Sequence, residues 1–186
     1  MYEIDVAILQ WLNSWVFWRP WADALIIFRA EYFGYLALAG LVAFGVAAFL
    51  PRFFHLRRKN WEMILVAFVA ALISRFGVVE LIRFFYDRPR PFEALPDLHR
   101  LVSHSSGGSF PSGHAALYFA IAAVVSRYYP KMSLLFYALA LSLSINRIAA
   151  GLHWPSDIVG GAIIGIAVGL LAVSVYQKLL KPKPAA

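Results

Sequence analysis

Long apolar stretches separated by short polar segments run along most of the chain. Two of these stretches, residues 32–51 and 158–177, each hold 20 residues without a formal charge. Each would be about 30 Å long as a helix, at roughly 1.5 Å per residue, which matches the hydrocarbon thickness of a bilayer. The pattern therefore predicts two helices that can span a membrane.

Three further stretches extend this prediction. Residues 61–82 are apolar except at three charged positions. Residues 114–126 and 132–146 have the composition of two shorter helices on either side of a polar turn. We therefore predict an all-α integral membrane protein, a helical bundle with about five transmembrane helices, which forms a single membrane-embedded domain of residues 1–186.

The N-terminal segment, residues 1–29, has a different pattern. Its apolar side chains recur at helical spacing between residues 2 and 18, at Ile4, Ile8, Trp11, Leu12 and Trp15. Polar residues occupy most of the other faces, which predicts an amphipathic helix lying in the membrane interface. A short sixth span around residues 22–28 is the alternative, but Asp23 and Arg29 leave it little apolar length.

Composition narrows the class of protein. Hydrophobic residues make up 61% of the chain and charged residues 15%, whereas a soluble domain is about half apolar and about a quarter charged. Six Trp, nine Tyr and 15 Phe residues exclude a disordered chain. The absence of cysteine excludes disulfides and thiolate chemistry. The net charge of +7 comes from basic residues between apolar stretches, so membrane topology explains it better than a nucleic-acid partner.

These basic residues predict how the chain is oriented. Nine of them fall on one side of the membrane when the predicted spans alternate: Arg52, Arg57, Arg58, Lys59, Arg127, Lys131, Lys178, Lys181 and Lys183. Loops rich in Lys and Arg face the cytoplasm, so this side is predicted to be cytoplasmic. The N-terminus, the connection 83–113 and the turn 151–157 would then meet on the opposite side.

Three groups of polar residues occur at the ends of spans on that opposite side. The first contains Arg83, Arg88 and Arg90, three arginines within eight residues that directly follow an apolar helix. Guanidinium groups are permanently charged, forked donors that suit phosphate oxygens. The alternative is a helix end that the arginines anchor to lipid headgroups.

The second group, Ser112, Gly113 and His114, follows a loop rich in Ser and Gly and opens the third predicted span. Ser112 suits the N-cap position, and the backbone N–H groups at the start of a helix can bind an anion. His114 would then lie in the first turn, beside that anion. The alternative is that Pro-Ser-Gly only starts the helix.

The third group lies around His153 and Asp157. Pro155 favours the first helical turn, which places Asp157 near the start of the fifth span and lets its carboxylate reach back toward His153. A carboxylate on one imidazole nitrogen leaves the other nitrogen as a nucleophile or base. The alternative is a helix cap beside a satisfied histidine. Together, the three groups predict a phosphate site. Placing this many charged groups at a membrane costs free energy, and such groups usually mark a functional site.

The three groups resemble the motifs of a known family, the type 2 phosphatidic acid phosphatases. The family pattern Lys-x6-Arg-Pro, Pro-Ser-Gly-His and Ser-Arg-x5-His-x3-Asp is similar to the stretches 83–91, 111–114 and 146–157, in the same order and with the same internal spacings. Two positions depart from it. Arg83 replaces the first lysine and keeps the cation, whereas Asn146 replaces the serine and removes its hydroxyl.

The resemblance implies a role for each matching residue. His153 would attack phosphorus and form a phosphohistidine, and Asp157 would orient it. His114 would protonate the leaving oxygen and then activate water. The residues implied to bind the phosphate oxygens are Arg83, Arg90, Arg147, Ser112 and Gly113. No cofactor or metal is implied, and the sequence has no carboxylate cluster to hold a metal.

Finer features resemble one branch of the family, the bacterial undecaprenyl-diphosphate phosphatases of the bacitracin-resistance type. They are the Tyr2-Glu-Ile start, the Glu31-Tyr32 pair and the connection from Phe92 to Ser109. This resemblance implies a lipid diphosphate substrate, held among membrane lipids at the outer face of a bacterial cytoplasmic membrane, from which the terminal phosphate is hydrolysed. Phosphatidylglycerophosphate, phosphatidate or a lipid A phosphate would be served by the same motifs. A non-catalytic protein that binds lipid headgroups is a further alternative.

Two more arginines require an account. Arg75, inside the second predicted span, would be costly if unpaired. We expect an ion pair with Glu31 or Glu80, and the alternative is that Arg75 shapes a headgroup pocket. Arg88 lies inside the first motif but outside its fixed positions, and it is expected to contact the phosphate or a headgroup.

Overall fold

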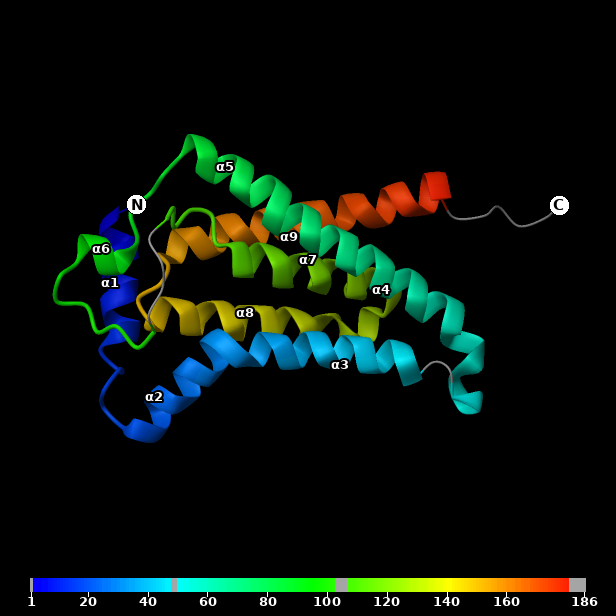
Figure 1. Cartoon of the computed structure of the whole chain (residues 1–186), viewed down its shortest axis with the longest axis horizontal. Coiled ribbons are helices and arrows are strands. Elements are labelled where there is room, and N and C mark those ends of the chain that lie inside the picture. The colour runs from blue at the N-terminus through cyan, green and yellow to red at the C-terminus, as the bar shows by residue number, and fades with distance from the viewer. Residues whose placement is uncertain (1, 48–49, 103–106, 181–186) are drawn as a thin grey trace.

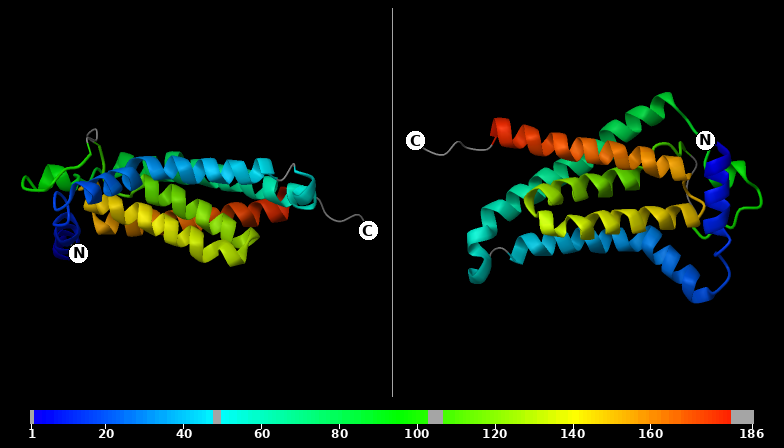
Figure 2. Two further views of the ribbon diagram at one scale, coloured as in Figure 1. Left: turned by 90° about the horizontal axis from the view of Figure 1, so that it is seen from below. Right: turned by 180° about the vertical axis from the view of Figure 1, so that it is seen from behind.

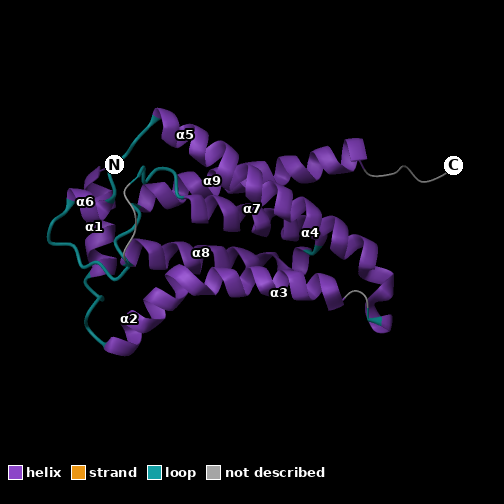
Figure 3. Cartoon of the chain, in the orientation of Figure 1, coloured by secondary structure: helices purple, strands orange, loops and turns teal. Residues whose placement is uncertain are grey.

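The computed structural model (Figure 1) describes residues 2–47, 50–102 and 107–180, which form a bundle of helices with no strand among them (Figure 3). The long helices among these residues are α3 (Phe33–Ala47), α4 (Arg57–Leu72), α7 (Gly113–Tyr128), α8 (Ser133–Ala149) and α9 (Pro155–Val175). α4 continues through a π-helical segment, Ile73–Val78, into α5 (Val79–Phe85). The predicted all-α architecture is confirmed.

In the described part of the chain, three helical segments are long and apolar enough to cross a membrane: Phe54–Phe85, Pro130–Ala149 and Pro155–Leu179. A fourth arises if α2 (Pro20–Ile27) and α3, which form a pair bent by 46°, count as one span. α7 has only 16 residues and lies inside the bundle, packed against α4, α8 and α9. The expectation of about five crossings corresponds to these four segments and the short α7. Residues 22–28 belong to the bent segment and do not form a separate sixth span.

α7 and α9 are closely packed because glycines on α9 remove the side chains between them. A Cβ atom at Gly165 would lie 2.3 Å from the carbonyl oxygen of Ala116, and Gly161 makes a similar approach one turn earlier. Small residues at this spacing let two membrane helices bring their backbones together. The contact sets the first turns of α7 and α9 side by side, where Ser112 N donates to the Asp157 carbonyl at 2.9 Å.

The N-terminal helix α1 (Tyr2–Asn13) lies across one end of the bundle, against α8 and α9 (Figure 2). Apolar side chains such as Ile4, which is 65% exposed, cover its outer face. The face toward the bundle carries Asp5, Leu9 and Asn13, all of them buried. The amphipathic helix is therefore present, but it docks on the protein through two polar residues as well as an apolar one.

Asn13 fixes the far end of α1 to the bundle. It donates through Nδ2 to the carbonyls of His99 and Ala149, both at 2.8 Å, and accepts from His99 N at 3.0 Å. His99 belongs to the connection that follows the short helix α6 (Pro91–Ala94), and Ala149 ends α8. The N-terminal helix, the long connection and the end of α8 therefore meet at the end of the bundle where α7 and α9 begin.

Candidate active site

The loop 107–112, just before α7, is the centre of the site because residues from the other two motifs bind to its backbone. Arg90 and His153 each donate to a carbonyl of this loop at 3.0 Å, and Arg83 donates to another at 2.9 Å. Arg90 also donates through Nη1 to the carbonyl of Leu152 at 2.9 Å. The three sequence groups, which are far apart in the chain, therefore converge on one loop.

His153 is held by its Nδ1 atom. This nitrogen lies 3.0 Å from the carbonyl oxygen of Ser109 and 3.5 Å from Oδ2 of Asp157. A carbonyl oxygen only accepts hydrogen bonds, so Nδ1 carries the proton in the neutral ring and the lone pair is on Nε2. The side chain is buried, at 1% exposure. The imidazole is therefore fixed in the tautomer that a nucleophile requires.

Asp157 is fully buried and has three roles at once. Its Oδ2 accepts from Trp154 N at 2.9 Å, which caps α9, and the same oxygen faces His153. Its Oδ1 accepts from Arg88 Nη1 at 2.7 Å. Pro155 occupies the first turn of α9, as the sequence predicts, and this geometry turns the carboxylate back toward His153.

Arg88 supports the site from behind, where the sequence predicted a contact with the phosphate or a headgroup. Besides Asp157, its guanidinium binds Asp5 of α1 at 2.8 Å and Ser156 Oγ at 2.7 Å. Asp5 in turn accepts from Ser156 N at 2.9 Å. These contacts direct Arg88 to two carboxylates and a hydroxyl, and they join Asp5 of α1 to Asp157 of α9.

The charges in this network stabilise one another. Burial raises the pKa of the Asp5 carboxyl, but hydrogen bonds from Ser156 and Arg88 outweigh it and hold that pKa below its usual value. Burial lowers the pKa of Arg88, but the hydrogen bond and charge of Asp5 and the charge of Asp157 raise it overall. α1 therefore carries an ionised residue to the back of the site, which sequence patterns did not predict.

The start of α7 presents the second motif. Ser112 is the N-cap residue, and its Oγ accepts from Ala115 N at 3.4 Å. Gly113 and His114 are the first two helical residues, and N–H groups in this turn have no partner within an α-helix. The ring of His114 lies 6.2 Å from that of Tyr118, centroid to centroid. The helix start is therefore arranged to face an anion, with an imidazole beside it.

Arg83 and Arg90 approach the same loop from the side of α5. Arg90 is 3% exposed, and burial lowers the pKa of its guanidinium. Arg83 directs Nη2 to the carbonyl of Pro111, and its Nε is buried without a hydrogen-bond partner in the described structure. Buried donors of this kind suit the oxygens of a phosphate.

Arg147 lies at the end of α8. Its Nη1 donates to the carbonyl of Ala30 at 2.8 Å, and its own carbonyl accepts from Leu152 N at 3.0 Å. Ala30 belongs to the π-helical turn Phe28–Tyr32 between α2 and α3. The structure therefore places Arg147 next to the His153 turn and against the bend of the first apolar segment. The neighbouring Asn146 donates through Nδ2 to the backbone of its own helix at 2.6 Å.

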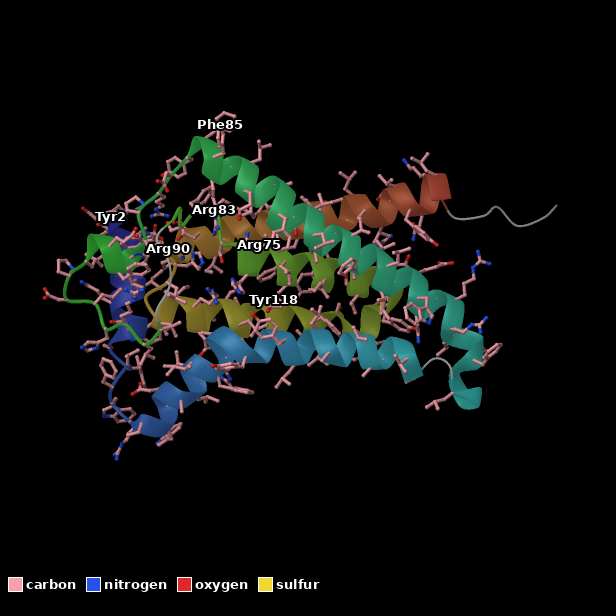
Figure 4. The ribbon with its side chains drawn as sticks, viewed as in Figure 1. Tyr2, Arg75, Arg83, Phe85, Arg90 and Tyr118 are labelled. Carbon is pink, nitrogen blue, oxygen red and sulfur yellow. The ribbon has the colours of Figure 1, made fainter. Side chains whose placement is uncertain are left out.

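Arg75 lies beside the site although the motifs do not include it. It forms the expected ion pair with Glu80, while the side chain of Glu31 lies outside the described residues. The same Arg75 side chain also lies against Gly113, because a Cβ atom there would be 2.5 Å from Arg75 Cδ. Figure 4 shows Arg75 and Arg83 between the helix that carries them and the start of α7. In the described part of the chain, no three His, Asp or Glu side chains are grouped to hold a metal ion.

Comparison with known proteins assigns this arrangement to a family. Residues 64–181, more than half of the chain, match the family model of the PAP2 superfamily. The chain belongs to the PAP2 superfamily. Its named relatives include lipid phosphatases, among them an undecaprenyl-diphosphatase and a lipid A 1-phosphatase, so this PAP2 protein belongs with hydrolases. Its helices make it a multi-pass membrane protein.

Individual relatives extend over different shares of the chain. The bacitracin transport permease protein BcrC of Bacillus licheniformis is 27% identical over 95% of this chain and 83% of its own. The undecaprenyl-diphosphatase BcrC of Bacillus subtilis is 31% identical over 61% of this chain and 56% of its own. The crystal structure of Aquifex aeolicus LpxE matches with a TM-score of 0.70 at 28% identity, covering 91% of this chain and 94% of that one.

Proposed function

We propose that this PAP2 protein hydrolyses the terminal phosphate of undecaprenyl diphosphate to give undecaprenyl phosphate, at the periplasmic or external face of a bacterial cytoplasmic membrane. The observation that carries the proposal is His153, whose Nδ1 is held by Ser109 and Asp157 beside the starts of α7 and α9. Likeness to relatives named for bacitracin and for undecaprenyl diphosphate supports this substrate.

In the first step, Nε2 of His153 attacks the terminal phosphorus in line. The bond between phosphorus and the bridging oxygen breaks, and the protonated His114 gives its proton to the departing lipid phosphate. Asp157 stabilises the positive charge that develops on the His153 ring. The product of this step is a phosphohistidine.

In the second step, the neutral His114 takes a proton from water, and the water oxygen attacks the phosphohistidine. The N–P bond breaks, inorganic phosphate leaves, and the electron pair returns to Nε2 of His153. Both steps place negative charge on the equatorial oxygens of phosphorus. The residues that stabilise it are Arg83, Arg90, Arg147, Ser112 and Gly113.

Phosphate release by the purified protein in detergent tests the substrate. Four lipids are compared without added metal: undecaprenyl diphosphate, phosphatidylglycerophosphate, phosphatidate and a lipid A phosphate. We expect the highest kcat/KM for undecaprenyl diphosphate. A higher kcat/KM for another lipid would transfer the assignment to that lipid, and no release from any of them would overturn the enzymatic proposal.

Two histidine variants test the assigned nucleophile. His153→Ala is expected to lower kcat by about 10³-fold or more, because the nucleophile of a covalent mechanism is lost. Binding of the lipid should be largely kept. His55→Ala is the matched control, because His55 is exposed at the opposite end of the bundle. Equal loss in both variants would contradict the assignment.

Cysteine labelling in intact cells tests the orientation, because the chain has no cysteine of its own. Asp97→Cys lies in an exposed turn at the site end, and Lys131→Cys is exposed at the other end. An impermeant maleimide should label the first in intact cells and the second only after permeabilisation. The reverse pattern would place the site in the cytoplasm.

A further inference from the structure

Arg75 lies at the phosphate site although no motif contains it. Its side chain covers Gly113, where a Cβ atom would lie 2.5 Å from Arg75 Nε and 2.8 Å from Cζ. Gly113 is the first residue of α7, a helix of 16 residues. The Arg75 guanidinium therefore adds a fork of charged donors to a helix end whose N–H groups already favour an anion.

The π-helical segment Ile73–Val78 brings Arg75 to this position. Arg75 and Arg83 are eight residues apart, and in a regular α-helix such residues lie about 80° apart around the axis. A π-helical turn holds more residues than an α-helical turn, so it rotates Arg75 toward the face of Arg83. Such turns inside α-helices recur at functional sites.

Positive charge exceeds negative charge on this face of the site. Arg75 and Arg83 both bind Glu80, the first through a hydrogen bond from Nη1 and the second at 3.4 Å. Arg83 and Arg90 each donate to a carbonyl of the loop before α7. Arg75 and Arg83 therefore share one carboxylate. The Nε of Arg83 is still buried without a hydrogen bond in the described part of the chain. An additional anion would balance this charge.

The position of Arg75 relates it to the leaving group. His153 attacks phosphorus from one side, so the leaving group departs on the other side, where His114 supplies the proton. His114 directly follows Gly113, against which Arg75 lies. A lipid monophosphate has an alkyl oxygen as its leaving group, whereas a lipid diphosphate has a second, charged phosphate.

We propose that Arg75 binds the second phosphate of a lipid diphosphate, the one that stays on the lipid, and thereby sets the preference for diphosphate over monophosphate substrates. This inference rests on the proposed function. The guanidinium fork would bind the non-bridging oxygens of that phosphate and stabilise the charge that it gains when the bridging bond breaks. Glu80, which is 47% exposed, orients the guanidinium from the outer side.

The test compares Arg75→Met and Arg75→Lys with a matched control on the same continuous helix. The control is Arg58→Met, because Arg58 also pairs with a glutamate, Glu62, at 2.9 Å, but does so at the opposite end. For each purified variant, kcat/KM is measured with undecaprenyl diphosphate and with phosphatidate. Retention on size-exclusion chromatography checks folding.

Loss of a charge-assisted donor predicts a specific change in selectivity. Arg75→Met should lower kcat/KM for the diphosphate by about 10- to 100-fold and for phosphatidate by about threefold at most. Arg75→Lys keeps the charge without the fork, so its selectivity should fall between those of Arg75→Met and the unmodified protein. Arg58→Met should change neither substrate.

A ratio of the two kcat/KM values that stays constant in the Arg75 variants would overturn the inference, whether both values fall or neither does. If Arg75→Met does not fold, Arg75→Lys gives the same comparison. Failure of the proposed function is seen separately, because the unmodified protein would then hydrolyse no lipid diphosphate. That result is obtained before any variant is made.

Discussion

The two helices that carry the site and the helix on the other side of the bundle are packed differently. α7 and α9 touch backbone to backbone along the glycines of α9, whereas a Cβ atom added at Gly40 of α3 would meet no atom of the described residues within 4 Å. An apolar cavity of about 580 Å³ lies between α3, α4, α7 and α8. In-line attack tolerates little displacement of the reacting groups. Close packing is therefore found between α7 and α9, which carry His114 and Asp157. The space lies beside α3, where the side chains make only apolar contacts.

Tyr118 marks the boundary between these two regions. It lines the cavity, and its ring lies 6.2 Å from that of His114. Its hydroxyl occupies the space beside Gly34 of α3, where a Cβ atom would lie 1.6 Å from the oxygen. Tyr118 therefore touches both regions, because it lines the cavity and also lies near His114 at the start of α7.

The two regions should differ most in their effect on kcat when one polar side chain is removed from each. Asp157→Asn should lower kcat by about 10³-fold, because the His153 tautomer and its developing charge lose their carboxylate. Tyr129→Phe removes the hydrogen bond to the buried Asn60, far from the site, and should cost about 1–3 kcal/mol of unfolding free energy with kcat unchanged. Steady-state kinetics gives kcat for each variant, and denaturant unfolding in detergent gives the free energy of unfolding.

Loss of kcat to the same extent in Asp157→Asn and Tyr129→Phe would contradict this comparison. It would mean that activity follows global stability rather than the geometry around His153.

A smaller effect is expected from the same substitution made in both regions, glycine to alanine. Gly165→Ala would force its Cβ against the Ala116 carbonyl, so it should destabilise the fold by about 1–3 kcal/mol and lower kcat. Gly40→Ala faces open space and should stabilise the helix by about 0.5–1 kcal/mol. Thermal unfolding and turnover distinguish them, and an equal response would show that the two contacts do not differ.

The smallest effect on activity concerns the docking of α1 on the site end. Asp5→Asn should lower the unfolding free energy by about 1–3 kcal/mol at pH 7 and kcat only modestly, because Arg88 keeps Asp157 as a partner. The matched control is Glu3→Gln, on the exposed face of the same helix, which should change neither.

The pH dependence of this effect follows from the lowered pKa of Asp5. The ionised carboxylate contributes its full stability above its unfolded pKa, near 3.8, and loses it as the pH falls through the lower folded pKa. The difference in stability between the unmodified protein and Asp5→Asn should stay constant down to about pH 5 and shrink only below 3.8. A difference that is already lost at pH 6 would show that Asp5 is not held by Ser156 and Arg88.

Local patterns are sufficient to predict the helices and the helix ends that carry the motifs. Apolar length located the spans, and the Pro155-to-Asp157 spacing located the carboxylate that faces His153. The short α7 was also found, because its N-cap and its apolar run are both local signals. These features depend on residues within a few turns of one another.

The support behind the site was missed because its contacts join residues far apart in the chain. Arg88 and Asp157 are 69 residues apart, and Asp5 and Ser156 are 151 apart. One signal was available: Asp5, Leu9 and Asn13 recur every fourth residue, which marks a second, mostly polar stripe on α1. The approach of Arg75 to Gly113 had no such signal, because a π-helical turn changes which residues share a face.

Trapping the covalent intermediate tests the central claim most directly. The protein is mixed with undecaprenyl diphosphate labelled with ³²P in its terminal phosphate, quenched within the first turnover and digested. The account predicts a label on the peptide that contains His153, stable to base and lost in acid as expected for an N–P bond. The label should be absent in His153→Ala, and in His114→Ala any label that forms should be lost more slowly by hydrolysis. Turnover without any labelled peptide, or a label that persists in His153→Ala, would contradict the account.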